Sequence, residues 1–165
     1  MAERLPAIVN LTEAAIPRLL EIENQVSYPS WNNKLFQQEF SNKYSQIYGA
    51  RLHGKLAAFL IVHTVLDEIH VVNLAVAQEF RRKGIAAHLL SFVFSDLGWN
   101  GARRAYLEVR IGNLEARALY EKLGFLDVGI RPKYYSNNNE DAQLMCLDLE
   151  YFLNELADKK IVVHQ

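Results

Sequence analysis

An apolar segment, a basic glycine-containing turn and an amphipathic helix follow one another between residues 74 and 97. The turn includes Arg82-Lys83-Gly84-Ile85-Ala86-Ala87, whose small residues let a ligand approach the backbone closely. The first N–H groups of a helix have no intrahelical partner, and the helix dipole adds positive potential at the same end. The order of elements therefore predicts an anion site that would suit a diphosphate. A solvated helix start is the alternative interpretation of the turn taken alone.

Two other phosphate-binding patterns are absent from the chain. A dinucleotide fingerprint needs three glycines, whereas this turn has only Gly84, and no Walker loop occurs. The formal net charge is -1 and 22% of the residues are charged, so the composition gives no whole-surface attraction to nucleic acid. We therefore expect local phosphate binding and no direct binding of nucleic acid.

The length of 165 residues fits one compact domain with a substantial core. We expect a single domain over residues 1–150 and a C-terminal extension over 151–165, which forms either a short helix or a frayed terminus. No apolar run reaches the roughly 18 residues needed to cross a bilayer, and the N-terminus does not resemble a signal peptide. The sequence predicts a cytoplasmic protein without a membrane partner, either a monomer or a weak homodimer.

The residues that most often hold metals or form covalent intermediates show no suitable pattern. Cys146 is the one cysteine and lies in a segment that alternates like a strand, which excludes a disulfide framework and a thiolate metal site. The five histidines lack metal-ligand spacing on a common helix face. No Ser-His-Asp or Cys-His arrangement is apparent. We predict no metal and no covalent acyl-enzyme.

Hydrophobic periodicity predicts an α/β (α+β) fold. We expect a strand over 7–10, a helix capped by Thr12, and a second helix over 32–40. Strands over 46–51, 56–65 and 69–76 should form an antiparallel meander. They are followed by a helix from 85 to about 97, a strand over 104–109 parallel to its predecessor, a helix over 114–123, and final strands over 125–134 and 142–149.

Over roughly residues 5–149 this order resembles the GNAT family of N-acetyltransferases. Three motifs carry the resemblance: the turn Arg81-Arg-Lys-Gly-Ile-Ala86, which matches Q/R-x-x-G-x-G/A; Asn113 at the start of a helix; and the run Ala118-Leu-Tyr-Glu-Lys-Leu-Gly-Phe125. The resemblance implies a GNAT fold, with a mixed central sheet of about seven strands, an antiparallel meander, a splayed parallel pair and about four flanking helices. It also implies acetyl transfer from acetyl-CoA to an amine.

The resemblance further implies where the cosubstrate binds. The CoA pyrophosphate would lie on the amides of residues 82–87, and the pantetheine arm would pair with residues 74–76 as if it were a strand. Asn113 would form a hydrogen bond near that arm, cap its helix, or do both. The expected cofactor-binding residues are Leu74, Ala75, Val76, Arg82, Lys83, Gly84, Ile85, Ala86, Ala87 and Asn113.

Acetyl transfer needs two proton movements, because the amine must lose a proton and the CoA thiolate must gain one. Leu107-Glu-Val-Arg110, followed by Asn113 and Tyr120, resembles the bacterial ribosomal-protein-alanine N-acetyltransferase (RimI) type within the family. In that pattern Glu108 is the base and Tyr120 the acid. Because Cys146 lies far along the chain from the turn and no nucleophile arrangement is apparent, we expect the amine to attack directly in a ternary complex. A solvated strand glutamate and a core tyrosine are the alternative interpretations.

The acceptor is expected to contact aromatic side chains. Arg131-Pro-Lys-Tyr-Tyr135 resembles the RimI-type segment in which Tyr134 and Tyr135 help to form a peptide groove, and Tyr28-Pro-Ser-Trp31 would supply the opposite wall. Both tyrosines also fit a plain edge strand. The first hypothesis is acetylation of a protein N-terminal α-amine, such as the alanine of a small-subunit ribosomal protein. Alternative hypotheses are a small-molecule amine, an internal lysine, and a CoA-binding module without turnover.

Overall fold

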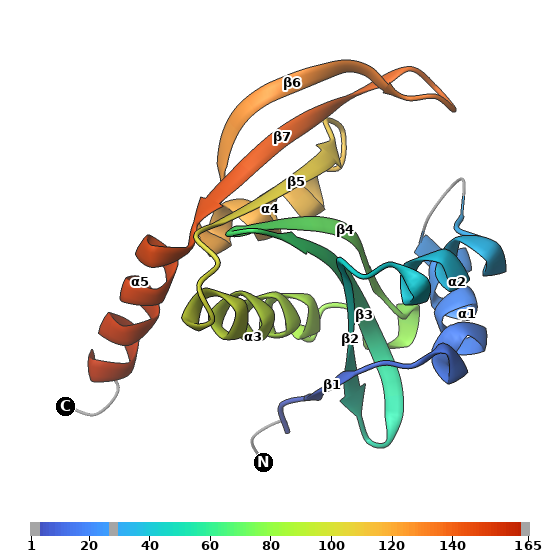
Figure 1. Ribbon diagram of the computed structural model, residues 1–165, viewed down its shortest axis with the longest axis horizontal. Coiled ribbons are helices and arrows are strands. Elements are labelled where there is room, and N and C mark those ends of the chain that lie inside the picture. The colour runs from blue at the N-terminus through green and yellow to red at the C-terminus, as the bar shows by residue number, and fades with distance from the viewer. Residues whose placement is uncertain (1–3, 27–29, 163–165) are drawn as a thin grey trace. The chain divides into compact units, whose positions relative to one another are not determined.

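The computed structural model describes residues 4–26 and 30–162 (Figure 1). Seven strands and five α-helices are present in this part of the chain, with two short 3-10 helices at Glu13–Ala15 and Gln78–Phe80. In chain order the larger elements are β1 (Ala7–Asn10), α1 (Ile16–Val26), α2 (Asn33–Ser41), β2 (Ser45–Leu52), β3 (Lys55–Val65), β4 (Glu68–Val76), α3 (Ile85–Trp99), β5 (Arg104–Arg110), α4 (Leu114–Leu123), β6 (Leu126–Tyr135), β7 (Glu140–Asp148) and α5 (Leu149–Val162).

The strands hydrogen-bond in the order β1-β2-β3-β4-β5-β7-β6. β1 with β2 and β2 with β3 are antiparallel, as are β5 with β7 and β7 with β6. β4 and β5 are parallel and pair over Glu68–His70 and Arg104–Tyr106. The predicted mixed sheet and its parallel pair are therefore confirmed. The expected splay concerns residues 74–76 and stays a prediction.

The chain divides into two compact units, which are described separately below. The first contains Met1–Thr64 and Val71–Phe92, and the second contains Val65–His70 and Val93–Gln165. β4 and α3 each contribute residues to both units. The predicted domain boundary at residue 150 stays a prediction. None of the helices in the described part of the chain is long and apolar enough to span a membrane.

The core of the first unit forms around β3. Seven consecutive residues of this strand, 56–62, are buried, which is typical of a strand covered on both faces. Phe59 on β3 packs edge-on against Phe36 of α2, with ring centroids 5.7 Å apart. α1 contributes Leu19 and Ile22, both fully buried, and Figure 1 shows α1 and α2 side by side. This packing fixes the helices that precede the meander.

The core of the second unit lies under β5, β7 and the helices α4 and α5. β5 alternates between buried and more exposed residues, with Leu107 and Val109 buried. Phe94 packs against Phe125 and Phe152 at centroid distances of 5.7 and 6.2 Å. β6 and β7 form a long bent hairpin, drawn in orange in Figure 1, and α5 follows β7. The alternation on β5 leaves Glu108 on the face away from the core.

Two local predictions need correction. Thr12 precedes a 3-10 helix and its side chain forms no capping hydrogen bond. β7 begins at Glu140 rather than at residue 142, because Glu140 and Asp141 already pair or hydrogen-bond with β6, so the polar loop shrinks to a turn over 136–139. On α3, Val93 is buried and Phe92 is 47% exposed.

Candidate active site

The first turn of α3 has backbone N–H groups without an acceptor within the helix. The first helical hydrogen bond runs from the His88 N–H to the Gly84 carbonyl over 3.0 Å, so the N–H groups of residues 85–87 have no acceptor within the helix. Arg82 and Gly84 have positive φ angles of 60° and 70°. Both residues are exposed, whereas Ile85 is buried and anchors the helix start. These amides can hold an anion.

Gly84 is suited to this place by its backbone and by the space around it. A Cβ added at Gly84 would meet no heavy atom within 4 Å, so open space adjoins the turn. Its positive φ lies in the left-handed region, which glycine adopts without the steric cost that other residues carry. A ligand phosphate can therefore approach the backbone at this residue.

The loop between β4 and α3 is held by α1. The Gln78 N–H donates to Gln25 Oε1 over 2.8 Å. The Arg81 guanidinium donates to the carbonyls of Val76 and Gln25, each over 3.4 Å. Sequence reasoning missed Gln25, which lies 53 residues before Gln78 and carries no motif. These contacts fix the backbone of the loop that leads from β4 to the predicted anion site.

The strand segment expected to bind pantetheine adjoins a buried carboxylate. Within 74–76 only Ala75 is buried. The preceding residue, Asn73, donates from Nδ2 to Glu23 Oε2 over 3.1 Å, and the Trp31 N–H donates to Glu23 Oε1 over 3.2 Å. Glu23 is only 1% exposed. Sequence reasoning missed this residue, because on α1 its spacing shows neither a motif nor a partner.

Glu108 is the predicted base. It lies on β5 opposite Leu144 of β7, and its side chain is 31% exposed. The Arg131 guanidinium of β6 lies 3.5 Å from Glu108 Oε1. Sequence analysis left Arg131 without a role, yet the structure places its cation beside the proposed base. The β6 strand of the hairpin therefore supplies a cation next to the carboxylate.

Tyr120, the predicted acid, is a core tyrosine. It is 7% exposed and its ring packs edge-on against Phe125 at 5.6 Å. Burial, with a smaller contribution from the nearby Tyr135, raises the pKa of Tyr120 to about 12. The hydroxyl therefore keeps its proton throughout the physiological range and can donate it. The packing role and the acid role are compatible.

Asn113 caps α4. Its Oδ1 accepts a hydrogen bond from the Ala116 N–H over 3.2 Å, so the predicted cap is confirmed. The helix ends at Gly124, whose φ of 104° lies in the left-handed region. The cap uses the carbonyl oxygen of the side chain, which leaves the Nδ2 group as the atom for the predicted cofactor contact. That contact stays a prediction.

The two predicted acceptor tyrosines lie together at the end of β6. Their ring centroids are 5.1 Å apart with perpendicular planes, and Tyr134 is 46% exposed. Burial raises the pKa of Tyr135 to about 12, Arg110 opposes the rise, and Tyr134 and Glu108 add to it. Within the second unit, Tyr135 lies within electrostatic range of Tyr120 on one side and of Glu108 and Tyr134 on the other. Tyr28 of the other predicted wall lies outside the described residues.

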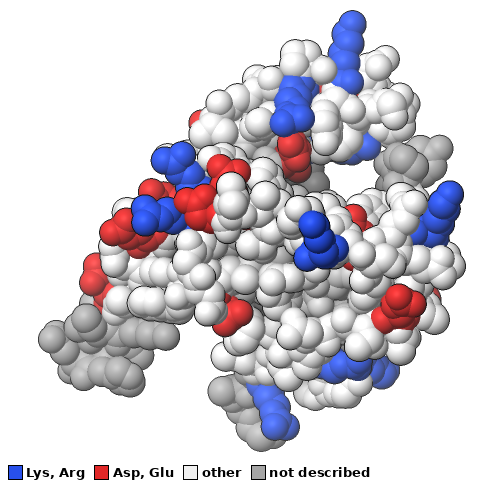
Figure 2. All heavy atoms as spheres, in the orientation of Figure 1, with Lys and Arg blue, Asp and Glu red and all other residues white. Residues whose placement is uncertain are grey.

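Neither the charged side chains nor the possible metal ligands indicate a second functional site in the described part of the chain. On the face drawn in Figure 2, acidic and basic side chains are interspersed. No group of three or more His, Cys, Asp or Glu side chains there is arranged to hold a metal ion. The candidate chemistry therefore rests on the turn of the first unit and the tyrosine and carboxylate group of the second.

Comparisons with known proteins agree with this arrangement. The model of the Acetyltransferase (GNAT) family matches residues 14–125. The ribosomal protein bS18-alanine N-acetyltransferase of Escherichia coli (strain K12) is 35% identical over 144 residues, which are 86% of this chain and 97% of that protein. A putative enzyme of the same name from Bacillus subtilis (strain 168) is 31% identical over 140 residues, 84% of this chain and 93% of that protein.

Solved structures show the same fold. The crystal structure of the ribosomal-protein-S18-alanine N-acetyltransferase from Escherichia coli has a TM-score of 0.82 and 33% identity, and the match covers 88% of this chain and 94% of that one. The predicted fold class is therefore confirmed. The family match extends over the turn, the proposed base and the helix that carries Tyr120. The chain thus belongs to the GNAT acetyltransferase family and is an acetyltransferase with acetyl-CoA as its acetyl donor.

Proposed function

We propose that this chain acetylates the N-terminal α-amine of a protein, and that the acceptor is the N-terminal alanine of a small-subunit ribosomal protein. The observation that carries the proposal is the group formed by Glu108, Tyr120 and Tyr135 in one compact unit. It supplies a carboxylate, a protonated phenol and an aromatic surface. The relatives named for acetylating the alanine of bS18, at 31–35% identity over most of the chain, support the same acceptor.

The cosubstrate supplies the acetyl group and the thiol leaving group. We assign its pyrophosphate to the amides of residues 82–87, because the N–H groups of residues 85–87 have no acceptor within the helix and the positive end of α3 favours negative charge. The backbone of residues 74–76 is assigned to the pantetheine arm and the Nδ2 group of Asn113 to a contact near it. Arg82 and Lys83 add positive charge beside the amides.

The protons are assigned to two side chains of the second unit. An α-amine is largely protonated near neutral pH, so Glu108 accepts its proton, directly or through a water, before the nitrogen attacks the thioester carbon. The carbon–sulfur bond then breaks and Tyr120 donates its proton to the departing sulfur. The raised pKa of Tyr120 keeps that proton available. The nitrogen loses its remaining surplus proton to solvent, and the amide product is neutral.

The acceptor is assigned to the aromatic end of the hairpin. Tyr134 is exposed enough to contact a peptide, and the Arg131 guanidinium lies 5.7 Å from its ring centroid as well as beside Glu108. An extended peptide N-terminus over these rings would bring its amine toward the base. We further propose that the enzyme works in the cytoplasm, binds no nucleic acid directly, and acts as a monomer or weak homodimer.

Two peptides test the acceptor class. One begins Ala-Arg-Tyr with a free N-terminus and lacks lysine, whereas the other is blocked at its N-terminus and carries a lysine. We expect acetylation of the free peptide in the presence of acetyl-CoA, measured by mass spectrometry. Modification of the blocked peptide alone would show a lysine acetyltransferase. Acetylation of a small primary amine but of neither peptide would show a small-molecule enzyme, and CoA binding without any product would show a module without turnover.

A further inference from the structure

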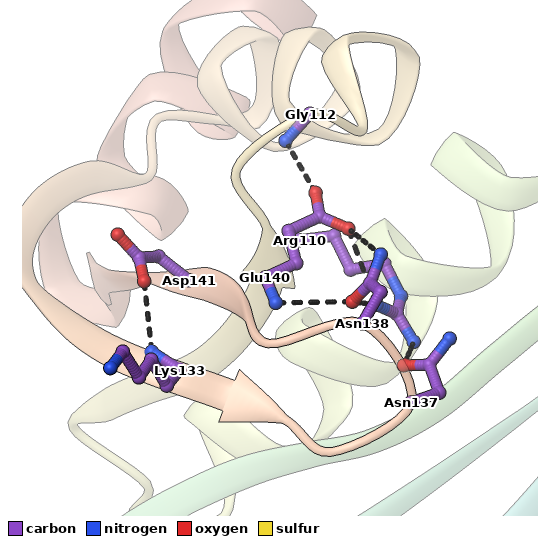
Figure 3. Close-up of polar contacts among 7 residues, drawn as sticks. All are labelled: Arg110, Gly112, Lys133, Asn137, Asn138, Glu140 and Asp141. Carbon is purple, nitrogen blue, oxygen red and sulfur yellow. Dashed lines mark hydrogen bonds and ion pairs between the residues drawn. The ribbon is translucent and has the colours of Figure 1, made fainter.

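The β6–β7 hairpin leaves its regular ladder just before the two tyrosines. The register shifts between Arg131 and Tyr135, and Lys133 within this stretch has a positive φ of 52°. The Lys133 N–H donates to Asp141 Oδ1 over 2.8 Å, as Figure 3 shows. A side-chain carboxylate thus holds the backbone at the irregularity. The direction in which the chain enters Tyr134 and Tyr135 depends on this local arrangement.

The turn after the tyrosines is held by one arginine at the end of β5. Arg110 Nη1 donates to Asn138 Oδ1 and to Glu140 Oε1, each over 3.2 Å. Arg110 Nη2 donates to Asn137 Oδ1 over 2.9 Å. Figure 3 shows the guanidinium inside the turn, in contact with all three acceptors. A planar guanidinium is suited to such contacts because its donors point in fixed directions.

Glu140 connects the same turn to the start of α4. Its Oε2 accepts the Gly112 N–H over 3.0 Å, while its Oε1 binds Arg110. A Cβ added at Gly112 would lie 3.0 Å from that same Oε2, so a side chain at residue 112 would push the carboxylate out of its present position. Asn113, which follows, caps the helix that carries Tyr120. The hairpin is therefore connected to the acid through one carboxylate.

The network ends on Tyr135. The Arg110 Cζ atom lies 3.9 Å from the centroid of that ring, which is a close guanidinium–aromatic contact. The hydrogen bonds to the turn fix the guanidinium of Arg110, and the fixed guanidinium in turn restricts the position of the Tyr135 ring. Arg110 also lies only two residues after Glu108 on β5. The proposed base and the orientation of Tyr135 thus depend on the same strand end.

The network is poorly placed to serve mainly as a folding device. The side chains of Arg110 and Glu140 are 25% and 23% exposed. Water still reaches and screens this ion pair, and ordering the two side chains costs entropy, so its contribution to folding stability is reduced. The effect of the network should therefore appear in the geometry of Tyr135 more than in the stability of the chain.

We propose that Arg110 and Glu140 are positioning residues for the acceptor, which hold Tyr135 in the orientation that the incoming α-amine requires. This inference rests on the proposed function, in which Tyr134 and Tyr135 contact the acceptor. Neither side chain takes part in the proton transfers. Loss of either one should weaken productive binding of the acceptor and leave acetyl-CoA binding unchanged.

The test compares Arg110→Lys with Arg117→Lys. Both arginines lie in the second unit with similar exposure, 25% and 22%, and both form an ion pair, but Arg117 pairs with Asp127. Arg110→Lys keeps the charge and loses the planar fork and ring contact. We expect its KM for the peptide beginning Ala-Arg-Tyr to rise about tenfold, with kcat and the KM for acetyl-CoA within about twofold of wild type. Arg117→Lys should leave all three unchanged.

A second substitution and a spectroscopic readout complete the test. Gly112→Ala should raise the peptide KM in the same way, because the methyl group displaces the Glu140 carboxylate. In aromatic NMR spectra without acceptor, the Tyr135 ring resonances should shift in Arg110→Lys and stay in place in Arg117→Lys. Unshifted resonances in Arg110→Lys, or a peptide KM equal to that of wild type, would overturn the positioning role. A wild-type enzyme inactive on the peptide would instead contradict the proposed function.

Discussion

The substitution Gly84→Ala can distinguish an effect on folding from an effect on CoA binding, because Gly54 provides a matched control. Gly84 and Gly54 lie in the same unit, have positive φ angles of 70° and 78°, and leave an added Cβ without a neighbour within 4 Å. Alanine at either position therefore creates no steric clash. It adds the strain of a left-handed residue and reduces the entropy of the unfolded chain, and the two effects together lower the free energy of unfolding by about 1 kcal/mol. For a chain of this length each variant should melt about 3 °C below wild type.

Binding should distinguish the two variants. The methyl group of Gly84→Ala occupies the open space beside the amides of residues 85–87, so a diphosphate loses one close contact with the backbone. A charge-assisted hydrogen bond contributes about 1.5–3 kcal/mol, which corresponds to roughly a tenfold to hundredfold loss of affinity. Gly54→Ala, in the turn between β2 and β3, should bind CoA like wild type.

Isothermal titration calorimetry with CoA, paired with thermal unfolding monitored by circular dichroism, measures both effects on the same samples. Equal melting temperatures with unequal CoA affinities support the reasoning. The assignment of the pyrophosphate to this turn would be refuted if Gly84→Ala bound CoA as tightly as Gly54→Ala. It would be refuted equally if both lost the same affinity, since that result would trace the loss to general destabilisation.

Other predictions concern the acid, the base and a buried carboxylate. Glu108→Gln and Tyr120→Phe should each lower kcat roughly a hundredfold while CoA affinity by calorimetry stays near wild type, and full rate in both would refute the acid–base assignment. Tyr120 has a pKa of about 12 in the folded chain and about 10 in the unfolded chain. The difference stabilises the folded state below pH 10, and this stabilisation is lost as the pH rises toward 12. Urea titrations should therefore show a fall in that window that is shallower in Tyr120→Phe by about 1.4 kcal/mol per pH unit, and equal slopes would contradict the burial argument. Glu23→Ala leaves the Trp31 and Asn73 donors unpaired and should lower the free energy of unfolding by about 3 kcal/mol in urea, whereas a loss below about 0.5 kcal/mol would show that these bonds are replaced by water.

Local signals account for the parts of the fold and site that the sequence predicts. A glycine that needs a left-handed φ marks both the turn at Gly84 and the end of α4 at Gly124, and an asparagine marks the helix start at residue 113. Period-two alternation on β5 correctly leaves Glu108 outside the core. Each of these signals lies within a few residues of the structural feature that it predicts, so local propensity and periodicity are enough to find the feature.

Contacts between distant segments could not be predicted in this way. Gln25 with Gln78, Glu23 with Asn73, and Arg110 with Glu140 join residues that are 53, 50 and 30 positions apart. A hydrophobic pattern tells which face of an element is buried, but it does not tell which polar side chains meet after packing. The side chain of Arg131 illustrates the limit, because no sequence pattern gives it a role, whereas the fold places it beside Glu108.

Tyr120 shows a different limit of sequence reasoning. Its helical spacing predicts a core residue, and the structure buries it as that spacing requires. The same burial raises its pKa and keeps it protonated, so a packing signal and a catalytic signal coincide in one side chain. Periodicity cannot separate two roles that require the same position. Only kinetics on a variant that keeps the ring and removes the hydroxyl can do so.

A single NMR titration tests the central assignment of the cosubstrate most directly. Backbone amide resonances of the ¹⁵N-labelled protein would be followed as CoA is added. We predict that the largest shifts fall on residues 82–87, because their N–H groups donate hydrogen bonds to the pyrophosphate oxygens. Saturable binding of CoA with those resonances unmoved would contradict it.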